Sequence, residues 1–136
     1  MRTIEFKAQN VNGAWVCGNL SILKKKIGNV DAGSYISNSA GAPFAYKVRP
    51  ETVSQFTGLT DENGKKIFEG DIVEIIEIDA FGNLDWNRLK GKVMFSEGAW
   101  LVTDNRSFAI PLRSEINEIK VIGNIYENPE LMEVST

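Results

Sequence analysis

Hydrophobic and polar residues alternate with a period of two along much of the chain, which is typical of β-strands with one buried face. In the N-terminal part this pattern covers residues 2–8, where Ile4 and Phe6 share a face, and residues 14–23. The intervening segment NVNG ends in an Asn-Gly pair, which favours a tight hairpin turn. These segments predict an N-terminal β-hairpin, in which we expect Cys17 to be a small buried apolar residue.

The C-terminal part contains five further segments with strand character. They cover residues 72–78, 91–95, 99–104, 107–112 and 119–127. The first of them is rich in β-branched residues, and a glycine-containing turn separates the second from the third. We expect Phe95 and Trp100, which lie in these two neighbouring strands, to pack in the core.

Short strands at regular spacing, without a helical pattern of ten residues, predict an all-β (mainly β) fold. We expect a single domain over residues 1–136. In it, an N-terminal hairpin and a flexible loop (residues 1–50) pack with a small, bent, SH3-like β-barrel (residues 51–136).

Three connecting segments complete the predicted fold. Residues 28–45 are rich in Gly, Ser, Asn and Ala and predict a long loop or a weak hairpin with a mobile tip, and residues 79–91 predict a wide connection. One short helical turn is expected at the C-terminal end. There Asn128 would cap the turn and Pro129 would occupy its first position.

The composition excludes several kinds of chemistry. The 136 residues include no histidine and a single cysteine, Cys17. Ser-His-Asp and Cys-His nucleophile systems therefore cannot form, and a zinc site with four Cys or His ligands cannot be assembled. We expect no enzyme activity, no catalytic residues, no metal and no cofactor.

Two features of the sequence bear on location. The segment MRTIEFKAQN lacks the apolar region of a secretory signal, and no apolar run reaches the length that spans a bilayer. We therefore expect a cytoplasmic protein with no membrane partner.

Charge is distributed unevenly along the chain. Residues 1–60 carry seven Lys or Arg and three acidic residues, a net charge of +4, whereas the remainder carries eight and fifteen, a net charge of −7. Such a dipole can support head-to-tail self-association or a site for a basic ligand, although ordinary solvation of two faces is the simpler interpretation. The triplet Lys24, Lys25 and Lys26, with Lys47 and Arg49, can also contact phosphates, although the overall acidity weighs against nucleic-acid binding. The simpler interpretation of the triplet is a solvated loop or strand end.

Four acidic residues lie close together in the sequence: Asp61, Glu62, Glu69 and Asp71. The segments DENG and EGD combine Asp with glycine, which predicts two turns in which Asp side chains bond nearby backbone N–H groups. The alternative is a site for magnesium or calcium, and with it a metal-dependent enzyme. The spacing does not fit a calcium-binding EF-hand loop, and two neighbouring lysines would oppose a cation.

Trp86 and Arg88 form the best candidate for contact with a protein partner. They lie in the polar segment DWNR of the predicted connection, and exposed Trp and Arg residues are typical anchors of protein interfaces.

Two longer motifs resemble a known family. The first, QFTGLTDENGKKIFEGDIV, begins at Gln55, and the second, VIGNIYENPEL, begins at Val121. In this order and at this separation they resemble the YopX family of phage and prophage proteins. The segment RTIEFKAQN resembles the family's first strand, with Gln9 where a tryptophan is usual. The resemblance implies a mostly β fold, a phage or prophage origin and no established activity.

We therefore expect a non-enzymatic phage or prophage accessory protein in the cytoplasm of a bacterial host. Its expected role is that of a small interaction module that binds a host or phage protein. Nucleic-acid binding and metal-dependent catalysis are the two alternatives.

Overall fold

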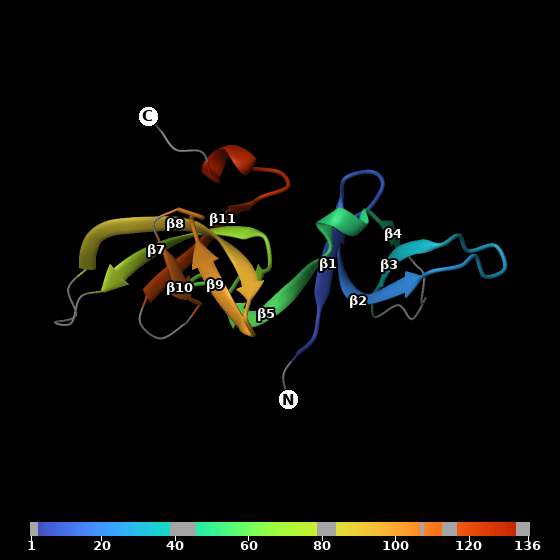
Figure 1. The fold of residues 1–136 in the computed structure, drawn as a ribbon, viewed down its shortest axis with the longest axis horizontal. Helices are drawn as coiled ribbons and strands as arrows, with labels where there is room; N and C mark the ends of the chain where they lie inside the picture. Colours follow the sequence, from blue (N-terminus) through green and yellow to red (C-terminus); the bar gives the residue numbers. More distant parts are fainter. Residues whose placement is uncertain (1–2, 39–45, 79–83, 107, 113–116, 133–136) are drawn as a thin grey trace. The chain divides into compact units, whose positions relative to one another are not determined.

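The computed structural model describes residues 3–38, 46–78, 84–106, 108–112 and 117–132; of residues 77, 78, 84–88 and 117 it describes the backbone alone. The chain forms two compact units, Met1–Phe56 and Thr57–Thr136, which we call the N-terminal and C-terminal units. Regular structure in the described residues is β apart from two short 3-10 helices (Figure 1). The predicted all-β fold is confirmed.

The N-terminal unit is an antiparallel sheet with the strand order β4-β3-β2-β1-β5. Its elements are β1 (Phe6–Gln9), β2 (Trp15–Leu23), β3 (Gly33–Ser37), β4 (Tyr46–Val48), the 3-10 helix η1 (Pro50–Thr52) and the first residues of β5 (Ser54–Thr60). In Figure 1, β2 and β3 run side by side and extend away from β1 as a hairpin.

The predicted hairpin between β1 and β2 is confirmed. The Asn10 side-chain oxygen accepts the N–H groups of Asn12 and Ala14, and the N–H of Gly13 donates to the Asn10 carbonyl. Gly13 has φ +86°, a conformation that glycine adopts without steric cost. The first strand is shorter than predicted, because it begins at Phe6, and Ile4 is exposed.

Cys17 is exposed, so the prediction that it is buried was wrong. The reason is the alternation of side chains along β2. Val16 and Leu20 pack against the buried core of this unit, which consists of Ala8, Ile36 and Val48. Cys17 has the opposite parity and lies on the other face, next to Trp15, whose ring is 5.0 Å from the Lys7 ammonium nitrogen.

Of the two predictions for residues 28–45, the long loop was wrong for most of the described part, which forms a hairpin with the preceding strand. Ile27 and Val30 form a β-bridge around a tight turn, and β3 follows with Ser34, Tyr35 and Ile36 buried. Small polar residues surround the apolar pair Tyr35 and Ile36 in the sequence, so the alternating pattern of a strand is not evident there. Residues 39–45 of the predicted loop lie outside the described residues.

The C-terminal unit begins within β5 and continues through a five-stranded antiparallel sheet. Its further elements are β6 (Lys66–Phe68), β7 (Asp71–Ile78), β8 (Leu84–Ser96), β9 (Ala99–Thr103), β10 (Ala109–Pro111), β11 (Asn117–Asn124) and the 3-10 helix η2 (Pro129–Met132). The sheet has the order β10-β9-β8-β7-β11, and the five predicted strands of this part of the chain are all present. Its core contains Ile67, Val73, Ile75, Val93, Val102, Leu112 and Ile119.

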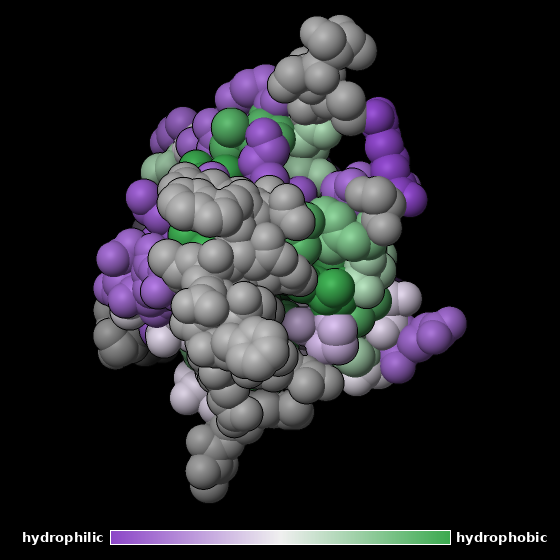
Figure 2. Space-filling view, turned by 90° about the vertical axis from the view of Figure 1, so that its left-hand side faces the viewer, coloured by the Kyte–Doolittle hydropathy of each residue, from purple (hydrophilic) through white to green (hydrophobic). Residues whose placement is uncertain are grey.

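The strands do not close into the predicted barrel. Among the described residues, β10 and β11 form the two edges of the five-stranded sheet and are not paired with each other. Figure 2, an end-on view, shows hydrophobic residues on the right-hand part of the face and hydrophilic residues at its margins. Hydrophobic residues thus remain at the surface there.

The connection predicted for residues 79–91 is shorter than expected, because β8 begins at Leu84. Trp86 and Arg88 therefore lie in a strand and not in a loop, and Arg88 pairs with Ile76 of β7. The polar residues of the segment DWNR hid the strand pattern. Residues 79–83 lie outside the described part of the chain.

The C-terminal turn is η2, and Pro129 is its first residue, as predicted. Asn128 does not cap it as expected. Its side-chain oxygen points back along the chain and accepts the N–H of Asn124 at 3.3 Å. In the described residues no helix is both long and apolar enough to cross a membrane.

Candidate functional site

Asp61 lies at a buried turn between β5 and β6, with 7% of its surface exposed. One carboxylate oxygen, Oδ1, accepts the N–H groups of Asn63 and Lys65, each at 2.9 Å. The N–H of Gly64 donates to the Asp61 carbonyl, and Gly64 has φ +78°. The predicted β-turn over the segment DENG is therefore confirmed.

The second oxygen of Asp61 makes a contact that the sequence did not predict. Oδ2 accepts the N–H of Val121, sixty positions along the chain in β11, at 3.0 Å. The neighbouring N–H of Glu62 donates to the Ile119 carbonyl at 2.9 Å. The turn thus occupies two backbone groups on the outer edge of β11, which would otherwise be open to another strand.

Hydrogen bonding also determines the protonation state of the Asp61 carboxyl group. Burial alone would raise the pKa of its carboxyl group. The three backbone N–H donors and the nearby Lys65 ammonium outweigh burial and hold the pKa below its ordinary value. The carboxylate is therefore ionised at neutral pH, with its oxygens directed at the backbone.

Asp71 has an equivalent role at the start of β7. It is 1% exposed, and its Oδ2 accepts the N–H of Phe68 at 2.8 Å. Between them Gly70, at φ +84°, donates its N–H to the Val93 carbonyl and accepts the N–H of Ile125. The predicted turn over the segment EGD is therefore confirmed, and it also joins β8 to the residues after β11.

The second motif makes a matching set of backbone contacts. The Asn124 side-chain oxygen accepts the N–H groups of Tyr126 and Glu127. Asn128 approaches so closely that a Cβ atom on Gly123 would lie 2.6 Å from its Oδ1. Gly123 is required here because any side chain would displace Asn128.

The acidic residues do not converge on a common point. Asp61 is directed at backbone N–H groups of its own turn and of β11, Asp71 at the N–H of Phe68, Glu62 is exposed and Glu69 is half-buried. In the part of the chain that the structure describes, no three Cys, Asp or Glu side chains are grouped so that they could hold a metal ion.

Both motifs lie within the part of the chain that matches a known family. A family model described as YopX protein matches residues 5–133. The chain belongs to the YopX family. The conspicuous residues of this YopX chain are thus the ones that build its turns and join its two motifs.

One solved structure supports the fold of the YopX chain. The crystal structure of protein EF1440 from Enterococcus faecalis is similar with a TM-score of 0.50 and 24% sequence identity. The alignment covers 98% of this chain and 100% of that one. At this identity the likeness concerns the fold alone. No curated protein matches the chain.

The predicted nucleic-acid contacts lie at separate places in the N-terminal unit. Lys24, Lys25 and Lys26 follow β2 and are exposed, and the Lys26 ammonium nitrogen lies 3.9 Å from Asp31. Lys47 is exposed in β4. The Arg49 side chain donates to the Val11 carbonyl at 3.4 Å, so it helps to hold the β1–β2 turn.

The predicted partner-binding pair, Trp86 and Arg88, is described by its backbone alone. The backbone of Trp86 and Arg88 lies in β8, and their side chains are outside the described set. Their role in partner binding stays a prediction.

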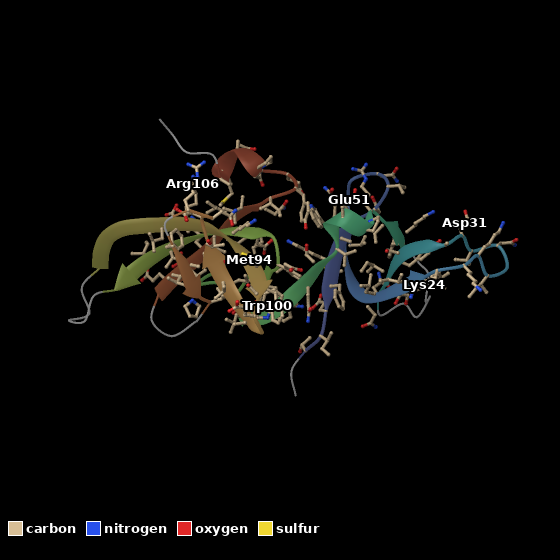
Figure 3. The ribbon with its side chains drawn as sticks, in the orientation of Figure 1. Lys24, Asp31, Glu51, Met94, Trp100 and Arg106 are labelled. Carbon is tan, nitrogen blue, oxygen red and sulfur yellow. The ribbon has the colours of Figure 1, made fainter. Side chains whose placement is uncertain are left out.

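The structure exposes one residue of an aromatic pair that the sequence prediction placed in the core. Phe95 and Trp100 face each other across the β8–β9 hairpin, with ring centroids 5.0 Å apart in an edge-on arrangement. Trp100, labelled in Figure 3, packs against the core of the C-terminal unit, but 52% of Phe95 is exposed. The prediction was wrong for Phe95 because this residue lies one position before the turn, beyond the end of the core.

Proposed function

We propose that this YopX protein is a non-enzymatic phage or prophage accessory protein that acts in the bacterial cytoplasm by binding a protein partner. The observation that carries the proposal is the exposed Phe95 held against Trp100. Aromatic residues dominate the binding energy of many protein interfaces. An aromatic ring that is already fixed loses little conformational entropy on binding.

The tight turn of the β8–β9 hairpin supports this role. Ser96 pairs with Ala99, so the loop has two residues, Glu97 at φ +51° and Gly98 at φ +81°. Positive φ at both positions is the geometry of a type I′ turn, which suits the twist of a hairpin. Glutamate adopts this conformation at a steric cost, which a packed hairpin can offset.

The state of the acidic residues supports a binding role over catalysis. A general base or a metal ligand needs a carboxylate oxygen that can approach a substrate or an ion. Asp61 and Asp71 are buried and accept backbone N–H groups instead. We therefore propose that the protein acts by binding to a surface of its partner and not by catalysis.

A photo-crosslinking amino acid placed at position 95 tests the proposal. In host cells that carry the phage or prophage, ultraviolet light is expected to join the protein to one protein of defined mass. The same amino acid at position 11 is the control, because Val11 is also exposed, at 62%, but lies on the β1–β2 turn.

The matched substitutions are Phe95→Ser and Val11→Ser in tagged protein. Phe95→Ser is expected to reduce co-purification of the partner that crosslinking identifies about 30-fold, as for the loss of an aromatic hot spot worth about 2 kcal/mol. Val11→Ser is expected to leave co-purification unchanged. Equal crosslinking from both positions, or no crosslinked protein above background, would contradict the proposal.

A further inference from the structure

The tip of the β2–β3 hairpin combines exposed aliphatic side chains with clustered lysines. Ile22 and Ile27 are 63% and 61% exposed, and Lys24, Lys25 and Lys26 lie between them. Figure 3 shows Lys24 and Asp31 on this hairpin, which extends away from β1. Exposed aliphatic residues that gather at one place on a surface can mark a site that another surface covers.

The backbone explains why the three lysines project. Leu23 pairs with Gly33, and Ile27 pairs with Val30. Between these two pairs, the three lysines that follow β2 therefore lie opposite only two residues, Asp31 and Ala32, that precede β3. An extra residue of this kind twists a hairpin and turns its side chains outward, as a β-bulge does.

The charge of the tip is positive and little compensated. Asp31 is the one acidic residue between residues 15 and 37, and its contact with Lys26 is between two exposed side chains at 3.9 Å. Exposed pairs of this kind are weak. No described acidic side chain lies within salt-bridge distance of Lys24 or Lys25. The tip can therefore attract an anionic surface.

From these observations we propose that the β2–β3 hairpin tip binds the surface of an anionic lipid bilayer, with Ile22 and Ile27 entering the interface and the lysines at the headgroups. Basic residues beside exposed aliphatic ones are the combination that binds peripheral proteins to anionic membranes. The inference goes beyond the proposed function and does not depend on it, because it concerns the other unit and needs no protein partner.

The residue types favour a bilayer over the other anionic partners. Lysine is depleted at protein interfaces, where Trp, Tyr and Arg provide most of the binding energy, and the segment ILKKKIGNVD contains none of these three. Single-stranded nucleic acid is bound by aromatic residues that stack on bases, and this segment has no aromatic residue. Neither partner accounts for the exposed isoleucines as a bilayer does.

Sedimentation with vesicles tests the proposal on the purified protein. Vesicles of phosphatidylcholine mixed with phosphatidylglycerol are expected to bind the protein, and vesicles of phosphatidylcholine alone are expected not to. Each lysine near such a surface increases binding about fivefold. Lys24→Glu with Lys25→Glu should therefore weaken binding about 30-fold or more. Lys90→Glu with Arg106→Glu is the control, because it changes the net charge equally at exposed positions of the C-terminal unit.

A second pair of variants tests the aliphatic contribution. Ile27→Ser is expected to weaken binding about tenfold, whereas Val11→Ser, at equal exposure on the other hairpin, leaves it unchanged. Absence of binding to the anionic vesicles would overturn the proposal, as would equal loss in the control variants. Binding to an oligonucleotide that requires the lysines but not Ile27 would also overturn it, in favour of nucleic acid.

Discussion

Replacing Asp61 with alanine is expected to lower the free energy of unfolding of the C-terminal unit by about 3–5 kcal/mol. The substitution leaves three backbone N–H groups, those of Asn63, Lys65 and Val121, without their acceptor at a partly buried site. Each buried donor that loses its partner costs about 1–3 kcal/mol, and partial relaxation of the turn reduces the sum. The outer edge of β11 would also be uncovered, so we expect the variant to self-associate more readily.

Urea unfolding of the variants measures this effect. Asp61→Asn keeps one acceptor oxygen but places an amide N–H₂ where the second oxygen was, so we expect an intermediate loss of about 1–3 kcal/mol. Glu62→Ala is the control, because Glu62 is exposed and its contact to β11 uses the backbone; it should change stability by less than about 0.5 kcal/mol. A loss for Asp61→Ala as small as that of the control would show that the turn does not depend on the carboxylate.

The second large effect is expected for Gly18→Ala in the N-terminal unit. A Cβ atom on Gly18 would overlap the carbonyl oxygen of Ser37 and lie 2.8 Å from its carbonyl carbon. These are backbone atoms of the adjacent strand, so they cannot move aside as a flexible side chain can. We expect the pairing of β2 with β3 to be disrupted and stability to fall by about 3–5 kcal/mol, the range of the most damaging single substitutions.

Amide NMR spectra show where the damage occurs. The core cluster of each unit contains described residues of that unit alone, so signals of the N-terminal unit should shift or disappear while those of the C-terminal core remain. Gly13→Ala is the matched control, because no atom lies within 4 Å of its added Cβ and only the positive φ is unfavourable, at about 1–2 kcal/mol. Loss of the amide signals of both cores together would contradict the division of the chain into two units with separate cores.

The turns were predictable from sequence, because their determinants are local. Asn10 and Asp61 bond to backbone groups within four positions of themselves, and Gly13, Gly64 and Gly70 take up positive φ. These residue types favour turns in almost any surrounding structure.

Contacts between distant segments were not predictable in the same way. The bond from Val121 to Asp61 spans sixty positions, and nothing in either segment alone indicates it. The resemblance of both motifs to one family indicated that they belong together, but it did not indicate which residues of the two segments pair. Cys17 and Phe95 were misplaced for a related reason. Burial depends on which face of a strand is covered and where the core ends, and the alternating pattern fixes neither.

The central claim is that the acidic residues of the first motif hold the backbone in place and do not carry out chemistry. Because proton binding is linked to folding, this claim predicts that the stability of the fold depends on pH. Because the folded pKa of Asp61 lies below its ordinary value of about 3.9, the ionised carboxylate stabilises the fold fully above that pH, and the stabilisation is lost as the pH falls toward the folded pKa.

A carbon-13 NMR titration of the Asp61 carboxyl group, with and without magnesium, tests the claim most directly. We predict a midpoint below about pH 3.9 that magnesium does not change. A midpoint above that value, or a carboxyl signal that moves when magnesium is added, would contradict it and would favour a metal or catalytic site.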